Sequence, residues 1–555
     1  MVAVADVQSS AAPRRGFRPS PEVLAAAVIA GAAVVRLAAF LVSLDDPYLR
    51  FRQGDEAYYH EWARAILAGG WQRGAPFFTT PLYAYFLALA YRIGGQDVAY
   101  IRFLNVLLGV GSVALTSLTA RTLLGPRAAV TAAALGAFCA APVFYEWLPE
   151  KTTLVLFLSS LVFFLVARAD AGRRPGAWLS AGLAGGAACL GHTLLLVALP
   201  AVWAHLALNR RGSNGSAGRA MALFGLGFFL GVAPATVHNW LQDGSFVPIC
   251  TTGGITFYIG NHAGNVTGRY ASPPFATSTA DSEERDFIAE AGRRAGRALK
   301  PAEASAYWFR QAWVEIAADP LLSLRRWWRR LRWTFGEAES TDSRTFEFYK
   351  ERHPVLLGTL WGFGLVSLLG LIGLGASRER GRAFTAALTL LFAAGMSAIL
   401  VYGRYRLPLL VPLSLLAAAG LERMPGLARE RRWPFLGALG VAAAALAWFV
   451  YTPVLPGVPV DFVTDYSNQG NRYWDLRQYD RAVQEYEKAL RVRPGVNPGV
   501  PRLYLGLGRI YAGRGELRRA EDLLREGAAR YPADGEIRSL LEDVRRRGAA
   551  ARHAP

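Results

Sequence analysis

The stretch that decides the fold is Val23-Leu-Ala-Ala-Ala-Val-Ile-Ala-Gly-Ala-Ala-Val-Val-Arg-Leu-Ala-Ala-Phe-Leu-Val42, an apolar run with a single charged residue. A helix needs about 20 such residues to cross a hydrocarbon core of about 30 Å. Nearly uncharged runs recur at 154–167, 383–401 and 435–451, and hydrophobic residues make up 52% of the chain. The sequence therefore predicts an all-α, polytopic membrane protein.

The apolar runs continue along most of the chain, and we expect about eleven membrane spans from their lengths. The segment 76–92 is apolar as well, which leaves a higher count open. The expected spans are 21–43, 97–123, 127–145, 151–168, 176–191, 193–208, 219–240, 354–376, 383–402, 407–421 and 434–452.

Positive charge gathers in the short loops on one side of these spans. Such loops favour the cytoplasmic side, so the N-terminal segment 1–20 is expected to be cytoplasmic. The net charge of +19 then reflects membrane topology, and we expect no nucleic-acid partner. The loops on this inner side contain Arg127, Arg168, Arg173, Arg174, Arg210, Arg211, Arg219, Arg378, Arg380, Arg382, Arg423, Arg431 and Arg432.

Two long loops, 44–96 and 241–353, fall on the outer side of a membrane domain that we place at 21–452. The second loop contains a basic and aromatic segment, 325–333. Trp and Arg at helical spacing are typical of a helix that lies at the membrane surface. Alternatively, one of its arginines holds a lipid phosphate.

The outer tail, 461–555, contains a repeated pattern of small and aromatic residues. Gly470 and Tyr473 recur as Gly508 and Tyr511, a spacing of 38 residues, and the later positions of the pattern recur at the same spacing. This pattern predicts an α-helical tetratricopeptide domain. Since two repeats are fewer than a stable stack requires, we expect them to dock on the membrane domain, on a second copy or against the helix after residue 533. A protein partner of the repeats is left open.

The first outer loop contains the acidic motif Gly54-Asp55-Glu56-Ala57-Tyr58-Tyr59-His60. Acidic residues at the start of a helix often cap it or offset its dipole, and this is one interpretation of Asp55 and Glu56. The aromatic and polar residues that follow favour another, in which the paired carboxylates form a reactive centre.

Two further sites are expected at the same outer surface. Glu150 lies where one span ends and the next begins, and it is either the first-turn acid of a helix or a second carboxylate of the centre. Asp55 and Glu150 together could bind a divalent cation. In the late turn Tyr402-Gly403-Arg404-Tyr405-Arg406, the arginines either bind phosphate or extend to lipid headgroups.

The order of these motifs resembles that of the C-type glycosyltransferases of the protein O-mannosyltransferase and lipid A aminoarabinose transferase group, particularly a branch that builds bacterial lipopolysaccharide core. The acidic motif, Trp71, Pro81-Leu82-Tyr83, Pro149-Glu150 and the late Arg404 turn follow one another as in that group. The segment 253–261 is similar to one in relatives with tetratricopeptide tails. The resemblance covers about residues 20–450.

The resemblance implies transfer of a sugar from a polyprenyl-phosphate donor to a periplasmic acceptor at the bacterial inner membrane. By it, Asp55 is the catalytic general base of an inverting reaction, helped by Glu56 and Glu150. It implies that Arg404 and Arg406 neutralise the leaving phosphate. The residues expected to contact substrate are Tyr58, Tyr59, His60, Tyr83, Arg404, Tyr405 and Arg406.

One departure from the group concerns the lysine that aminoarabinose transferases place before the proline motif. Thr79 and Thr80 precede Pro81 here, so phosphate binding is expected to depend on the arginines, and the aminoarabinose substrate is not carried over. No nucleotide cofactor is expected, because no Gly-rich loop follows a strand pattern. A polysaccharide polymerase or ligase, and a transporter or flippase of lipid-linked glycans, are the alternatives.

Overall fold

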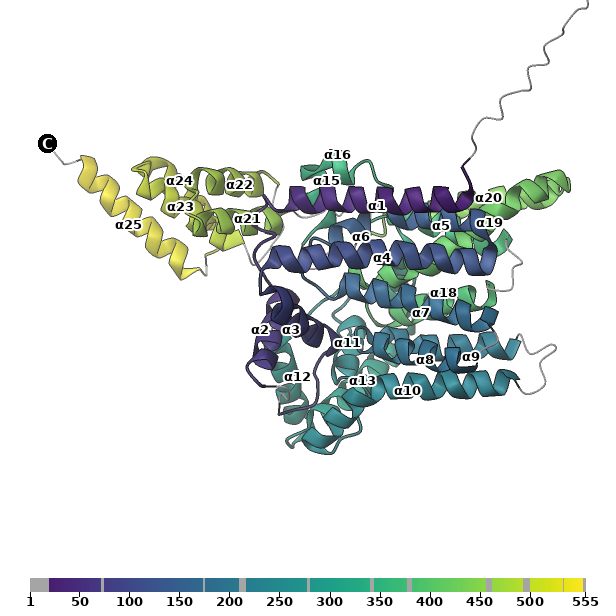
Figure 1. Ribbon diagram of the computed structural model, residues 1–555. Coiled ribbons are helices and arrows are strands. Elements are labelled where there is room, and N and C mark those ends of the chain that lie inside the picture. The colour runs from purple at the N-terminus through teal and green to yellow at the C-terminus, as the bar shows by residue number, and fades with distance from the viewer. Residues whose placement is uncertain are drawn as a thin grey trace, which may run out of the picture.

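The fold is a bundle of long helices with further helices and a helical tail at one end (Figure 1). The computed structural model describes residues 19–70, 74–172, 175–208, 216–276, 280–339, 344–376, 382–455, 462–492, 500–532 and 534–552. Every secondary-structure element in these ranges is a helix, as predicted. Most of the expected cytoplasmic segment 1–20, Trp71, residue 461 and part of the basic inner loops (173–174, 210–211 and 378–380) lie outside them.

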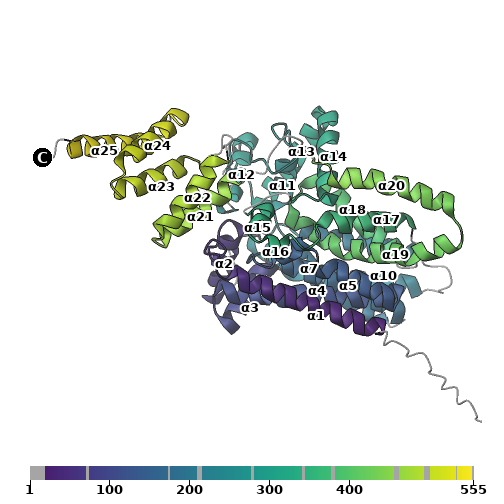
Figure 2. The same cartoon turned by 90° about the horizontal axis from the view of Figure 1, so that it is seen from above.

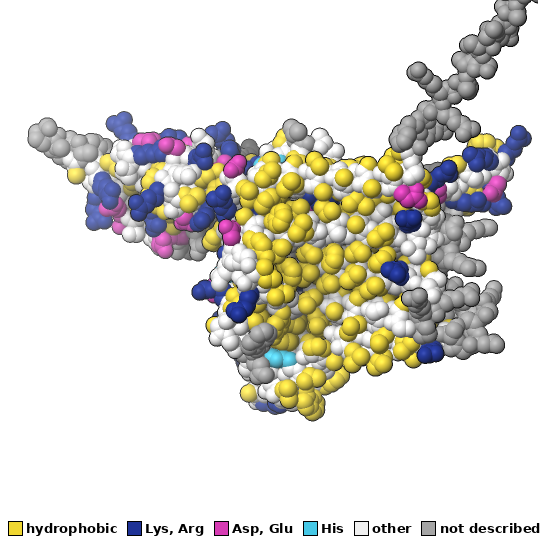
Figure 3. All heavy atoms as spheres, in the orientation of Figure 1, with side chains coloured by type: hydrophobic (Ala, Val, Ile, Leu, Met, Phe, Trp, Pro, Cys, Tyr) yellow, Lys and Arg dark blue, Asp and Glu magenta, His cyan; other side chains and the backbone are white. Residues whose placement is uncertain are grey.

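Among the described residues, six helices are long and apolar enough to cross a membrane. They belong to one bundle in Figure 1, and the face of this bundle in Figure 3 is apolar while charged side chains gather on the tail. This distribution fits a multi-pass membrane protein. The six are α1 (Pro21–Ser43), α4 (Val98–Leu124), α7 (Thr152–Gly172), α10 (Ser216–Asp243), α19 (Leu410–Arg429) and α20 (Trp433–Tyr451).

The other expected spans form shorter or interrupted helices, so the count of eleven stays a prediction. Span 127–145 breaks after residue 137, and span 193–208 starts with a 3₁₀ turn. These elements are α5 (Pro126–Ala137), α6 (Ala140–Tyr145), α8 (Pro175–Cys189), η1 (Thr193–Val197), α9 (Ala198–Leu208), α17 (Phe363–Ala376) and α18 (Arg382–Ile399). The 3₁₀ turn η2 (Gly403–Leu409) leads into α19.

The two long loops fold into helices at the end of the bundle that faces the tail (Figures 1 and 2). The apolar segment 76–92 forms the short helix α3 and part of the loop before it. The first loop contains α2 (Asp55–Leu67) and α3 (Leu82–Gly94). The second contains α11 (Thr252–Asn261), α12 (Ala280–Ala295), α13 (Pro301–Ala318), α14 (Pro320–Phe335) and α15 (Phe346–Arg352), and α16 (Pro354–Leu357) follows it.

The tail consists of paired helices, and the small residues of its repeat lie where large side chains pack. The space beside Gly470 is filled by the ring of Tyr486, and that beside Gly508 by Leu524. The tail has its own apolar core, to which its last helix also contributes. Its helices are α21 (Val463–Asp475), α22 (Tyr479–Arg491), α23 (Val500–Gly513), α24 (Leu517–Arg530) and α25 (Gly535–Arg552).

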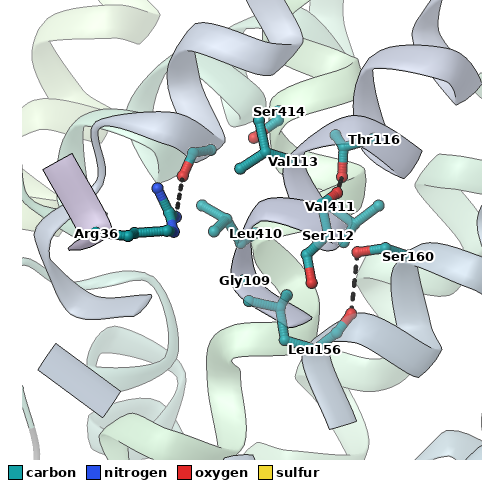
Figure 4. Close-up of a pocket in the computed structure, with 11 residues that line it drawn as sticks. Arg36, Gly109, Ser112, Val113, Thr116, Leu156, Ser160, Leu410, Val411 and Ser414 are labelled. Carbon is teal, nitrogen blue, oxygen red and sulfur yellow. Dashed lines mark hydrogen bonds between the residues drawn. The ribbon is translucent and has the colours of Figure 1, made fainter. Parts of the chain in front are cut away.

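Arg36 forms a buried ion pair with Glu146 inside the bundle and also lines a small cavity (Figure 4). Arg36 Nε of α1 donates to Glu146 Oε1 at 2.9 Å, and its Nη1 donates to the carbonyl of Ala137 at 2.7 Å. Hydroxyls line the cavity, which is about as large as one water molecule. The ion pair therefore fixes α1 against α5 and α6. The lining hydroxyls belong to Ser112, Thr116, Ser160 and Ser414.

Helices α8 and α10 approach each other closely because glycines line both sides of their contact. A Cβ on Gly186 would lie 2.1 Å from the carbonyl oxygen of Phe228, and one on Gly227 would lie 2.1 Å from that of Leu179. Small residues that let two backbones meet are characteristic of helix contacts in membranes.

We therefore expect Gly186→Leu to force α8 and α10 apart and lower the thermal unfolding temperature of the detergent-solubilised protein by several degrees, since overpacking costs about 1–3 kcal/mol. Gly176→Leu is the matched control, because a Cβ at this position of α8 meets no atom within 4 Å. Equal unfolding temperatures for both variants would contradict this packing.

Candidate functional site

The acidic motif begins α2, and the glycine before it sets the turn. Gly54 has a φ of +52°, a conformation that glycine adopts without strain. Asp55 and Glu56 are the first residues of the helix, and the Glu56 amide donates to the Gln53 carbonyl at 3.0 Å. Both acids thus lie in the first turn of a helix, where acidic residues often cap the helix or offset its dipole. Each also forms an ion pair with a distant arginine, which capping does not require.

Arg404 joins Asp55 to Glu150 and is the centre of the site. Its Nη2 donates to Asp55 Oδ2 at 2.8 Å, and its Nη1 donates to Glu150 Oε2 at 3.2 Å. The side chains of Arg404 and Glu150 are buried, whereas that of Asp55 is 36% exposed. Residues from the first loop, η2 and the segment just before α7 therefore meet, and Asp55 is the more exposed of the two carboxylates.

Lys151 supplies a second positive charge that the sequence reasoning did not assign. Its Nζ donates to Thr80 Oγ1 at 3.0 Å and to the Tyr59 hydroxyl at 3.3 Å. The lysine therefore reaches Thr80, the second of the two threonines before Pro81, although it comes from a different segment. The signal for it was its position directly after Glu150 in a chain with few lysines.

The charges around Asp55 control its protonation. Burial acts to raise the pKa of Asp55, but Arg404 and Lys151 outweigh burial and lower it below the ordinary value. Burial, Lys151 and Arg404 together lower the pKa of His192 to about 3. Asp55 is therefore ionised at neutral pH, and the neutral His192 ring, 4.9 Å from that of Tyr405, adds no charge.

A third acid, Glu283 of α12, approaches the site from the second loop and was also missed from sequence. Burial and the charge of Asp55 raise the pKa of Glu283 to about 7, although a hydrogen bond with Tyr270 acts in the opposite direction. Glu283 therefore changes protonation near neutral pH. Nothing in the sequence around it indicates that α12 brings it to Asp55.

Glu56 points away from Asp55 and is fully buried against Arg344, with which it forms an ion pair. Arg344 Nη2 also donates to the carbonyls of Tyr48 at 3.2 Å and Phe51 at 2.6 Å. Arg344 was not expected from sequence. The pair connects the first loop with the second, so Glu56 holds the loop in place beside the site.

Arg406 faces the protein interior and does not enter the site. Its Nη2 donates to Glu339 Oε1 at 2.6 Å, and its Nη1 donates to the carbonyls of Trp333 at 2.8 Å and Gly336 at 2.5 Å. Although Arg404 and Arg406 are two residues apart, they bind different acids.

The predicted aromatic contacts fall into two groups. Tyr59 lies under Lys151, with the ammonium 5.6 Å from its ring centroid, and Tyr405 lies beside Arg404. Tyr58 and Tyr83 are buried and belong to the large apolar core that continues into the bundle. His60 Nδ1 forms a hydrogen bond of 2.9 Å with the Tyr91 hydroxyl.

The residues present do not fit the divalent cation considered for Asp55 and Glu150. The Arg404 guanidinium lies between these carboxylates and binds both. In the described part of the chain, no group of three or more His, Cys, Asp or Glu residues is arranged to hold a metal ion.

The basic and aromatic segment 325–333 lies in α14, and two of its arginines are buried. Arg326 Nη1 donates to the carbonyl of Asn261, and Arg330 Nη2 donates to the Asn261 side chain at 2.8 Å. Leu324 and Trp328 on the same helix are exposed. These buried arginines bind the C-terminal end of α11, where cations are favourable, and are not directed at a lipid phosphate.

Comparison with known proteins gives two family matches. Residues 78–238 match the family described as dolichyl-phosphate-mannose-protein mannosyltransferase, and residues 467–535 match a tetratricopeptide repeat. The first region contains Glu150 and Lys151. No curated protein matches the chain in a sequence search.

Several solved structures are similar in their helical arrangement. ArnT from Cupriavidus metallidurans, solved bound to undecaprenyl phosphate, is 17% identical over 89% of this chain and 79% of its own, with a TM-score of 0.43. The oligosaccharyltransferase of Archaeoglobus fulgidus, in a complex with Zn and sulfate, is 14% identical over 85% of this chain and 58% of its own, with a TM-score of 0.43. That enzyme, AglB, in complex with an inhibitory peptide and a dolichol-phosphate, has a TM-score of 0.41 at 16% identity, over 85% of this chain and 60% of its own.

The family matches confirm the expected class of protein, which is a multi-pass membrane glycosyltransferase with a tetratricopeptide tail. Its transferase region resembles the dolichyl-phosphate-mannose-protein mannosyltransferases from residue 78 to residue 238. The predicted resemblance to the C-type group is thereby confirmed. The roles of individual side chains remain predictions.

The buried pair of Arg344 and Glu56 generates a stability prediction. Removing one partner of a buried ion pair costs about 3–5 kcal/mol, so Arg344→Met is expected to lower the unfolding temperature markedly, and Arg344→Met with Glu56→Gln to recover part of the loss. Arg64→Met removes an exposed pair with Glu61 and is the control. A double variant as unstable as Arg344→Met would show that the two residues are not coupled.

Proposed function

We propose that this protein transfers a sugar from a polyprenyl-phosphate donor to an acceptor on the outer side of a bacterial inner membrane. The observation that carries the proposal is one partly exposed carboxylate, Asp55, held beside two cations, Arg404 and Lys151, at one end of a membrane bundle. A carboxylate is suited to accept a proton, and paired cations are suited to bind a phosphate.

The family match supports the donor class, because a dolichyl-phosphate sugar is a polyprenyl-phosphate sugar. Such a donor is anionic at its phosphate and apolar along its chain. The bundle offers a broad apolar surface (Figure 3), and Arg404 and Lys151 lie against residues of α2. Donor phosphate and donor lipid thus both have a complementary surface.

The chemical step follows from the positions of the charges. Asp55 accepts the proton of the acceptor hydroxyl, and the hydroxyl oxygen forms a bond to the anomeric carbon of the donor sugar. The bond from that carbon to the phosphate oxygen breaks, and polyprenyl phosphate leaves with the electron pair. Attack opposite to the leaving group inverts the anomeric centre. Arg404 and Lys151 stabilise the negative charge that develops on the phosphate.

Arg404 also connects donor binding to the strength of the base. Without donor, its guanidinium binds Asp55 and lowers the pKa of that acid. When the phosphate of the sugar donor accepts hydrogen bonds from the N–H groups of Arg404, this ion pair weakens. Asp55 then becomes a stronger base. Glu150, which binds the other side of the guanidinium, keeps Arg404 in place meanwhile.

A polysaccharide polymerase or ligase, the alternative function, would have arginines of the second long loop in its active site. Arg326, Arg330 and Arg344 of this loop bind backbone carbonyls, Asn261 or Glu56, so none of the three is directed at the cluster around Asp55. We therefore retain the single-sugar transferase. The acceptor, whether lipid, glycan or protein, is recognised in the periplasm, where the C-terminal repeats also lie in this topology.

Asp55→Asn is expected to lower transfer from a polyprenyl-phosphate sugar by at least about a hundredfold, because the amide cannot accept the proton. The purified protein is assayed for release of polyprenyl phosphate, with its unfolding temperature as a check on folding. Asp45→Asn, an exposed acid in the same loop, is the matched control. Unchanged transfer by Asp55→Asn would exclude Asp55 as the base.

Lys151→Met is expected to raise the KM for the donor about tenfold or more, since a hydrogen bond to a charged group contributes about 1.5–3 kcal/mol. The KM for the acceptor should stay the same. Lys350→Met changes a lysine of α15 and is the control. If the two variants bind donor equally well, Lys151 does not hold the phosphate.

A further inference from the structure

The first helix of the tail, α21, docks on the first outer loop through polar side chains. Asn468 Nδ2 donates to the Tyr48 hydroxyl at 3.0 Å, and Gln469 Nε2 donates to Asp46 Oδ1 at 3.3 Å. The Thr345 amide donates to Asp465 Oδ1 at 3.3 Å. The tail is therefore attached beside the segment that leads to Asp55, as Figure 2 shows for α21, α2 and α15.

Buried polar residues distinguish α21 from a helix that packs only within its repeat. Asp465 and Gln469 are 2% and 0% exposed. Buried polar groups require hydrogen-bond partners, and partners of both come from the membrane domain. A second contact, between Arg352 of α15 and Glu485 of α22 at 3.1 Å, fixes the tail further along.

Tyr48 connects this docking surface to the acidic motif. Its hydroxyl accepts from Asn468 and also from Gln53 Nε2, at 2.8 Å. The backbone amide of Gln53 donates to Glu56 Oε2 at 3.3 Å. Arg344 lies over the Tyr48 ring, 4.9 Å from its centroid, and forms the ion pair with Glu56. Two routes thus lead from α21 through Tyr48 to Glu56, the neighbour of Asp55.

The loop needs such support because its turn is built on Gly54, whose conformational freedom is large. A base must be held in reach of its proton, and displacement by about 1 Å can cost about a hundredfold in rate. Within the loop, Glu56 binds the backbone of Gln53 on both sides. The Gln53 side chain connects this turn to Tyr48, which α21 contacts through Asn468.

We propose that α21 is a positioning element of the active site, which holds the segment 46–54, and through it Asp55, by means of Tyr48 and Gln53. The effect on catalysis rests on the proposed function of Asp55, whereas the effect on the loop does not. Tyr48, Gln53 and Asn468 are positioning residues in this arrangement. The tail is part of the transferase, and its removal loosens the loop that carries the base.

Tyr48→Phe and Asn468→Ala test the proposal in the full-length protein. Tyr48→Phe keeps the ring under Arg344 and removes the hydroxyl that joins Asn468 to Gln53. Tyr511→Phe is the matched control, because it removes a tail hydroxyl that binds Glu487 at 2.7 Å within the tail. Hydrogen–deuterium exchange of peptides from 46–58 is measured first, and kcat and donor KM afterwards.

We expect faster exchange in 46–58 for Tyr48→Phe and Asn468→Ala, a kcat lowered roughly tenfold and an unchanged donor KM, with Tyr511→Phe like the wild type. Exchange in 46–58 that equals that of Tyr511→Phe would overturn the proposal, as would faster exchange with an unchanged kcat. If the wild type transfers no sugar from polyprenyl-phosphate donors, the proposed function fails, and exchange alone then decides whether α21 holds the loop.

Discussion

The site depends on one guanidinium held between two carboxylates. Arg404 contacts Asp55 and Glu150, and these residues come from η2, α2 and the segment just before α7, so the ion pairs fix three segments relative to one another. Removing such charges from water is costly, and buried pairs contribute little net stability. What the arrangement provides is a fixed geometry, with the charges in place before a substrate arrives.

The two acids of the motif have different tasks because of helix geometry. Successive residues of an α-helix point in directions about 100° apart. Asp55 therefore faces Arg404 and remains partly exposed, while Glu56 faces the interior and pairs with Arg344. One pair of acids thus gives a partly exposed carboxylate in the site and a buried anchor. The two arginines of η2 also have different partners. Arg404 binds Asp55 and Glu150 in the site, and Arg406 binds Glu339 in the interior.

Features that depend on local sequence were predictable, and those that depend on distant contacts were not. Apolar runs indicated the bundle, the repeat indicated the tail, and the expected topology placed Asp55, Glu150 and Arg404 at one surface. Arg344 lies 288 residues from Glu56, and no spacing rule joins them. Lys151 was visible beside Glu150, but only the fold shows that it reaches Thr80, where the group's lysine was missing.

The docking of the tail follows the same logic as the ion pairs. A glycine turn gives Asp55 the direction it needs, but glycine does not hold a direction by itself. The restraint comes from residues far along the chain: Arg344 from the second loop and Asn468 from α21, which meet at Tyr48. Both contact the segment just before Asp55, so on our proposal a displaced tail loosens the same backbone as a broken Arg344–Glu56 pair. The tail and the second loop are then two supports of one short segment, and the position of the proposed base depends on both.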